Sequence, residues 1–198
     1  NDALSSQIAI HTKADKLIIL TDVDGLYDQN PKIYPAAKKI SFLNKIPQTL
    51  LNNKNLKHQV SARYIYEHLF LAHISFEDKS ENFFELIKSK TPSGQNTQII
   101  PTRFPYDKID GDFYYRFKKI DSTIVHKTHM VYKLNDAKLE RYNELFINPT
   151  WDQEAFLPSY DSKTAVNALK TFEQIPANSR YQFLLDDVHY IIMTFIRG

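Results

Sequence analysis

The strongest helix pattern in this sequence runs over residues 55–74 (NLKHQVSARYIYEHLFLAHI). Its apolar residues recur at helical spacing along one stripe, and further apolar side chains widen that stripe. They are Leu56, Val60, Tyr64, Leu71 and Ile74, with Ile65, Leu69 and Ala72 beside them. Asn55 is a residue type that caps helix N-termini. Because the apolar face is so broad, we predict a helix that is buried on most of its sides.

The segments that follow alternate between helical and extended patterns. We predict helices over residues 80–88, 135–146, 162–172 and 176–196, and strands over residues 97–100 and 113–117. Residues 91–96 (TPSGQN) are turn formers and are predicted as a loop. These patterns together indicate a helix-rich, mixed domain of the α+β class.

The first 40 residues follow a different pattern. A helical segment over residues 3–15 precedes an apolar run (KLIIL, 16–20) and a polar turn (TDVDGLY, 21–27). This order is typical of an α/β unit, in which ligands bind at the carboxyl ends of strands. An ordinary turn that starts with Asp and contains Gly explains the same residues. We predict two pieces, a short α/β remnant at residues 1–40 and a mixed domain at 41–198.

Composition excludes several classes of protein. The formal net charge is only +2, which does not suggest a nucleic-acid-binding protein. The sequence has no cysteine, so it contains no disulfide, thiolate metal site or Cys-x-x-Cys-His haem attachment. No apolar run approaches the ~20 residues of a membrane span, and no signal-peptide pattern is visible. Aromatic residues reach 13%, which is typical of a packed chain and not of disorder.

Two arginines in aromatic-rich segments are candidates for binding an anionic head group. Arg103 lies in RFPY and Arg116 in FYYRFKK. A cationic rim around an aromatic wall could bind the carboxylate or phosphate of a lipid, with the acyl chain on the rings. A half-exposed strand shows the same pattern without any ligand.

Four acidic or imidazole side chains are further candidates. Glu67 and His68 lie in the apolar helix, where they form either a satisfied core network or part of a site. His126 and His129 share a face only in a helix, and their segment has an extended pattern, so we assign no metal site.

Residues 1–40 contain LTDVDGLYDQNP and begin with NDALS. They resemble glutamate 5-kinase of the amino-acid kinase family, from within its Gly-Asp-Asn-Asp-x-Leu-Ser motif through its Leu-Thr-Asp-x-x-Gly-Leu-Tyr motif. The resemblance implies that Asn1 contacts the glutamate substrate and that Thr21 and Asp22 contact the nucleotide, ATP. The family's glycine-rich phosphate loop precedes the matched region, so we expect this piece to be too small to phosphorylate glutamate.

Two long motifs, RYIYEHLFLAH (63–73) and DSTIVHKTHM (121–130), lie in the longer piece. With WDQEAFLPSY and the segment IPANSRYQFLLDDVHYIIMTFIRG, they resemble the bacterial fatty acid cis/trans isomerase family from about residue 50 to Gly198. The resemblance implies a periplasmic enzyme that converts cis-unsaturated acyl chains of membrane phospholipids to trans. It also implies haem c, attached through a Cys-x-x-Cys-His motif that lies upstream of the matched region in this family.

Because that haem-attachment motif is absent here, the resemblance implies an internal fragment that is inactive alone. It strengthens one set of candidate site-lining residues without giving them catalytic roles: Glu67, His68, Arg103, Arg116, His126 and His129. Two alternatives remain. The chain is either a glutamate 5-kinase, cytoplasmic if that part dominates, or a non-catalytic fusion remnant whose join lies within residues 38–54.

Overall fold

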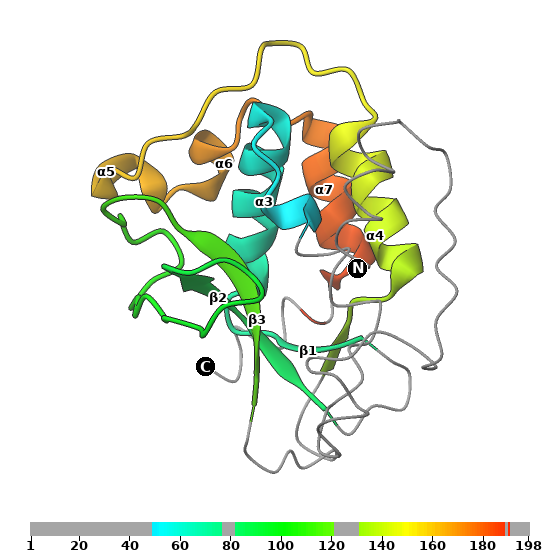
Figure 1. The fold of residues 1–198 in the computed structure, drawn as a ribbon. Helices are drawn as coiled ribbons and strands as arrows, with labels where there is room; N and C mark the ends of the chain where they lie inside the picture. Colours follow the sequence, from blue (N-terminus) through cyan, green and yellow to red (C-terminus); the bar gives the residue numbers. More distant parts are fainter. Residues whose placement is uncertain (1–48, 77–81, 121–130, 189, 191–198) are drawn as a thin grey trace, which may run out of the picture. The chain divides into compact units, whose positions relative to one another are not determined.

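The computed structural model describes residues 49–76, 82–120, 131–188 and 190. All of them belong to the second of two compact units, Asn1–Phe42 and Leu43–Gly198. The described part contains helices and a four-stranded sheet, which confirms the α+β class (Figure 1). The predicted α/β remnant at residues 1–40 lies outside the described residues.

Helix α3 (Leu56–Leu69) is the predicted apolar helix and lies at the centre of this unit (Figure 1). The side chain of Asn55 accepts a hydrogen bond from the backbone N–H of Lys57, which confirms the predicted cap. Every residue from 60 to 66 is buried, so α3 is enclosed on all sides within this stretch. The prediction was wrong at the C-terminal end, because residues 73–75 form a strand and not a last helical turn.

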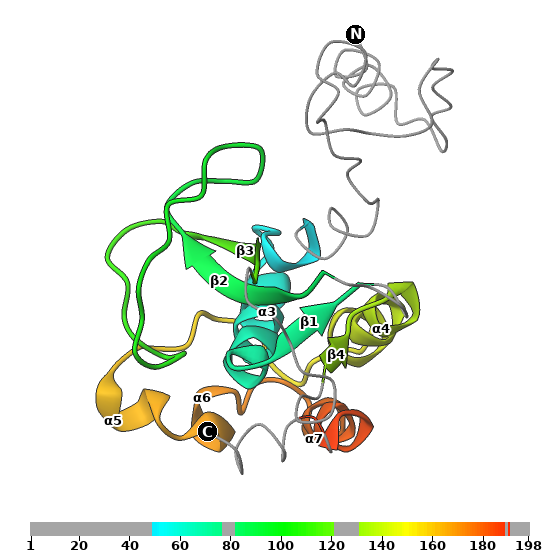
Figure 2. The same cartoon turned by 90° about the horizontal axis from the view of Figure 1, so that it is seen from below.

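The sheet has the strand order β3-β2-β1-β4 (Figure 2). Strand β1 (His73–Ser75) pairs antiparallel with β2 (Phe84–Ser89) and parallel with β4 (Val131–Lys133). Strand β3 (Tyr114–Lys119) pairs antiparallel with β2, with Leu86 opposite Phe117. The strand predicted at 113–117 is therefore confirmed, and the one predicted at 97–100 is reduced to a single bridge between Ser89 and Ile99.

The helix predicted over residues 80–88 was wrong, because β2 occupies residues 84–89. The apolar side chains of Phe84 and Leu86 and the long side chain of Lys88 alternate along the strand, and Leu86 and Lys88 are buried. A period of two is the strand pattern. The neighbouring apolar residues Phe83 and Ile87 add a helical spacing to the same short segment, so the local pattern was ambiguous.

Two tyrosines show how α3 joins the layers of the fold. Tyr66 points to the sheet, with its ring centroid 5.0 Å from that of Tyr115 on β3. Tyr64 points to the opposite side and lies 5.6 Å from Phe146, 5.0 Å from Phe172 and 5.4 Å from another core ring, Phe183. Residues two apart on a helix face nearly opposite directions, so one short sequence serves both sides of the core.

The remaining helices surround α3, with α4 and α7 on one side and α5 and α6 on another (Figures 1 and 2). Their bounds are α4 (Asp136–Tyr142), the π-helix η2 (Asn143–Ile147), α5 (Ser162–Ala165), α6 (Ala168–Thr171) and α7 (Ala177–Asp186). The predicted helix at 135–146 is confirmed, with Asn135 as its cap. The one predicted at 162–172 is broken in two, because Asn167 caps a new helix. In the described part of the chain, no helix has the length and apolar character to cross a membrane.

Candidate functional site

Arg63 lies in the second turn of α3 and is only 4% exposed. Its Nε donates a hydrogen bond to Glu67 Oε1 at 2.7 Å, and its Nη1 donates to the carbonyl oxygens of Pro158 at 2.7 Å and Ser159 at 3.2 Å. The ring of Tyr160 lies 3.6 Å from the guanidinium carbon. The four-residue spacing on α3 places the side chains of Arg63 and Glu67 on one face of the helix. Because both charges are buried, they must be paired.

Lys88 on β2 is 1% exposed and lies beside this ion pair. Its Nζ is 4.7 Å from the ring centroid of Tyr66, 5.3 Å from that of Phe113 and 5.4 Å from that of Tyr160. The same Nζ donates a hydrogen bond to the carbonyl oxygen of Pro105 at 3.0 Å. Aromatic faces attract a cation, so this cage replaces part of the hydration that the ammonium group loses.

Arg63, Glu67 and Lys88 are called the Arg63 cluster below. Burial lowers the pKa of Lys88 to about 8, although Glu67 and Asp107 act in the opposite direction. Burial also raises the pKa of Glu67, and Arg63 offsets only part of this effect. The pKa of Tyr66 rises to about 12 because the ring is buried. The cluster thus contains two cations and one carboxylate in a region of low solvent access.

A cavity of about 580 Å³ borders the cluster and is called the Arg63 cavity. Its lining combines Arg63 with aromatic and aliphatic side chains and with amides. Leu51, Phe113 and Leu157 supply the aliphatic and aromatic wall, and Tyr160 continues it over the guanidinium. A wall of this kind with one buried charge suits a ligand that has an apolar body and an anionic end.

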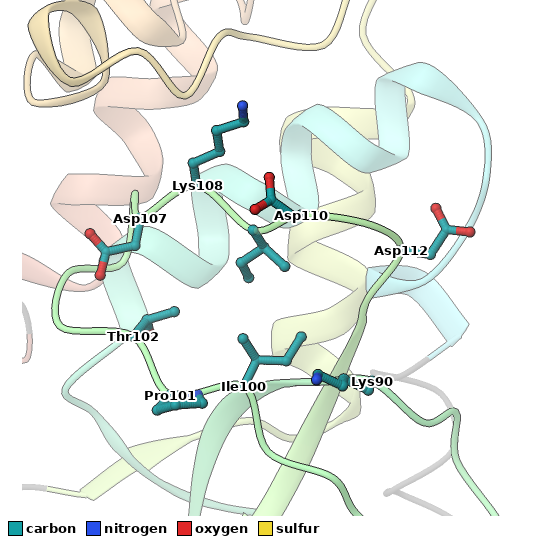
Figure 3. A pocket seen from close by; sticks show the side chains of 9 residues that line it. Lys90, Ile100, Pro101, Thr102, Asp107, Lys108, Asp110 and Asp112 are labelled. Atoms are coloured by element: carbon teal, nitrogen blue, oxygen red, sulfur yellow. The ribbon is translucent and has the colours of Figure 1, made fainter.

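A second cavity, of about 650 Å³, lies under the loop that connects residues 90 and 112 (Figure 3). Figure 3 shows Asp107 and Asp112 at opposite ends of this cavity, with their carboxylates pointing apart. Asp107 Oδ2 already accepts from the backbone N–H groups of Arg103 and Phe104. No group of three His, Asp or Glu side chains among the described residues could hold a metal ion. Among the described residues, this cavity therefore offers no set of side chains that converge on a metal ion.

The structure separates Glu67 from its neighbour His68. Glu67 joins the Arg63 cluster, whereas His68 faces the ring of Phe183 at 5.6 Å on the other side of α3. The Nδ1 of His68 is 2.8 Å from the carbonyl oxygen of Tyr64. Burial lowers the pKa of His68, which favours the neutral imidazole with a proton on Nδ1. His68 is thus a partly buried residue that is hydrogen-bonded to its own helix, and it does not line the Arg63 cavity.

The two predicted arginines do not meet in space. Arg116 on β3 donates through Nη1 to the carbonyl oxygens of Pro92 at 3.0 Å and Gln95 at 2.9 Å, so it fixes the loop at residues 91–95. Arg103 is exposed, and its guanidinium lies 5.2 Å from the ring of Phe104. Asn1, Thr21, Asp22, His126 and His129 lie outside the described residues.

Sequence reasoning did not single out Arg63, Lys88 or Tyr160. The i, i+4 spacing of Arg63 and Glu67 within an apolar helix was a usable signal, because two charges there must be paired. Lys88 had no such signal, since its cage comes from Tyr66 of α3, from Phe113 just before β3 and from the segment at residue 160.

Comparisons with known proteins identify the family. The family model described as fatty acid cis/trans isomerase (CTI) matches residues 25–198, and the chain belongs to this family. No solved structure matches the chain.

A shorter similarity links the chain to glutamate 5-kinases. The chain is 51% identical over 51 residues to the glutamate 5-kinase of Geobacillus thermodenitrificans, and this segment covers 26% of this chain and 14% of the relative. The similarity to the glutamate 5-kinase of Methanosarcina barkeri is 54% over 46 residues, or 23% of this chain and 12% of the relative. The chain is 47% identical over 53 residues to the glutamate 5-kinase of Streptococcus uberis, which covers 27% of this chain and 20% of the relative. The chain therefore spans only a small part of these curated relatives.

The described residues do not fit a covalently attached haem c. Such a haem needs cysteine thiols, and the sequence has none. Neither cavity is lined by His or Met, the usual axial ligands of haem c.

Proposed function

We propose that this chain is part of an enzyme that converts cis-unsaturated acyl chains of membrane phospholipids to trans. The observation that carries the proposal is the family match over residues 25–198. We further propose that the enzyme works in the periplasm with haem c that another segment of the full-length protein binds.

Within this proposal, the Arg63 cavity holds the acyl chain. Leu51, Phe113 and Leu157 provide apolar contacts, and the volume of about 580 Å³ lies within the range of small-molecule sites. The described residues bind and orient the chain, and the change at the double bond belongs to the segment that binds haem.

The test is the ratio of trans to cis fatty acids, measured by gas chromatography, in a bacterial host that lacks its own isomerase. We expect trans chains when this protein is expressed together with the haem-binding segment of a family member, and none when either is expressed alone. Leu157→Trp should lower the yield by narrowing the cavity. Leu169→Trp is the matched control, because Leu169 is 62% exposed and does not line the cavity.

Three results would contradict the proposal. Trans chains produced by the purified protein alone would show that haem from another segment is not needed. Unchanged trans production with Leu157→Trp would show that the cavity does not hold the acyl chain. No trans fatty acid from the two folded segments together would show that this protein is not part of such an enzyme.

The 51% identity to a glutamate 5-kinase over 51 residues favours a second candidate function. The test is ADP formation from ATP with and without glutamate. We expect no glutamate-dependent turnover. A turnover that is lost in Asp22→Ala, the predicted nucleotide contact, would favour the kinase.

A further inference from the structure

We propose that the Arg63 cavity is a binding site for an oxyanion that ends an apolar chain, and that the guanidinium of Arg63 holds its oxygen atoms. The inference rests on the proposed function for the apolar half of the ligand. It adds the charged half, a carboxylate or a phosphate, and names the residue that recognises it.

One of the three nitrogen atoms of the Arg63 guanidinium, Nη2, has no hydrogen-bond partner. Nε donates to Glu67, and Nη1 donates to the carbonyl oxygens of Pro158 and Ser159. Nη2 is buried and has no hydrogen-bond partner. A buried cationic donor without a partner is costly, and a guanidinium edge is well suited to a carboxylate or phosphate.

The charges around Arg63 balance without a ligand. Lys88 is a second buried cation, and Glu67 pairs with Arg63 and also acts electrostatically on Lys88. Asp107 is a second carboxylate that acts on Lys88, so two cations face two carboxylates. At the cavity lining itself, Lys54 and Asp112 are of opposite sign and offset each other. The unpaired Nη2 donor, and not an excess of positive charge, is therefore what an oxyanion would satisfy.

The orientation of the guanidinium is fixed before a ligand arrives. Glu67 holds one edge, two carbonyl oxygens hold Nη1, and Tyr160 covers a face at 3.6 Å. Nη2 is shielded from solvent, so an oxyanion reaches it when the adjoining wall, residues 157–160, shifts. That shift releases the contacts of Pro158, Ser159 and Tyr160 with the guanidinium, and the hydrogen bond from Nε to Glu67 then holds it in place. That wall lies outside the helices and strands, and its movement breaks no strand pairing.

The experiment is isothermal titration calorimetry of the full 198-residue chain with three ten-carbon probes below their micelle concentrations: decanoate, decyl phosphate and decanol. We expect the anionic probes to bind about tenfold or more tightly than decanol, because a charged hydrogen bond adds to the same apolar contact. Tighter binding of decyl phosphate than of decanoate would indicate a phosphate head, and the reverse order a carboxylate.

Variants at the exposed rim avoid the risk of unfolding the cluster. Leu157 is 57% exposed, so Leu157→Glu and Leu157→Gln should both fold, and both lose the apolar contact of the leucine. Binding of both anions should be about tenfold weaker in Leu157→Glu than in Leu157→Gln, because only the carboxylate repels the probes. Leu169→Glu, outside the cavity, is the matched control. Arg63→Lys keeps the charge but loses the paired donors, and should reduce the preference for the anions over decanol.

Each remaining result overturns a defined part of the inference. Equal binding of decanol and the anions, or equal binding of the anions by Leu157→Glu and Leu157→Gln, would leave an acyl cavity without an anion site. Failure of all three probes to bind would overturn the anion site together with the proposed acyl cavity. Hydrogen exchange that stays unchanged at residues 157–160 when decanoate binds would place the ligand elsewhere.

Discussion

Lys88 is an ammonium group in the interior, with three aromatic rings around it and a pKa lowered to about 8. Its usual value of 10.5 applies in the unfolded chain. Between these two values the unfolded state binds more protons than the folded state, so the free energy of unfolding rises with pH. The destabilising charge is fully present below pH 8 and is relieved as the pH rises through that value.

We predict that the wild-type chain gains about 1–2 kcal/mol of stability between pH 8 and 9.5 relative to Lys88→Met. The measurement is urea unfolding of both chains at several pH values. Only the slope with pH is compared, because the substitution also removes the hydrogen bond to Pro105. Parallel slopes for the two chains would mean that Lys88 keeps an ordinary pKa.

At the residue scale, the sequence identified one member of the Arg63 cluster. Glu67 was selected because a carboxylate in an apolar helix needs a partner, and that partner is Arg63. His68 was selected by the same argument, but its partner is the carbonyl of its own helix. The sequence shows that a buried polar group must be satisfied, and only the tertiary contacts show whether a neighbouring charge or the backbone does so.

At the scale of elements, α4 and α7 are joined by a buried carboxylate. Asp187 is completely buried at the end of α7 and accepts from Tyr132 Oη at 2.7 Å and from Lys138 Nζ at 2.5 Å. The next residue back, Asp186, is half-buried and pairs with Arg141 at 2.7 Å. Two adjacent aspartates thus connect the same two helices in different environments.

We predict that Asp187→Asn lowers the free energy of unfolding by about 3 kcal/mol, because the variant removes a buried carboxylate that accepts from both Tyr132 and the partly buried ammonium of Lys138. Asp186→Asn should cost about 1 kcal/mol or less, since a partly exposed pair contributes little. Chemical denaturation of both variants checks the difference. Equal losses would show that the burial of Asp187 does not decide its contribution.

Predictability from sequence also differed among the elements. The prediction of helix α3 was correct over residues 56–69, because apolar residues recur at helical spacing over a long stretch and a capping asparagine precedes them. Strand β2 was missed, because six residues hold too few repeats to separate a period of two from one of 3.6. Its identity comes from pairing with β1 and β3, segments on either side of it in the chain.

At the scale of the whole molecule, two different similarities meet in one chain. The family match begins at residue 25, inside the unit Asn1–Phe42, whereas the core packs side chains of α3, the sheet and α7 within Leu43–Gly198. The predicted division near residue 40 therefore implies that the larger unit folds by itself, as a unit with its own core should.

We predict that deleting residues 1–42 changes the free energy of unfolding by less than about 1 kcal/mol. In the shortened chain, Asp187→Asn should cause the same loss as in the full chain, because distant and independent sites are additive. Urea unfolding followed by tryptophan fluorescence suits this test, since Trp151 is partly buried against the core. A shortened chain that lost cooperative unfolding would place part of the core before residue 43. The segment 25–42 would then belong structurally to the isomerase family match and not to a separate kinase-like piece.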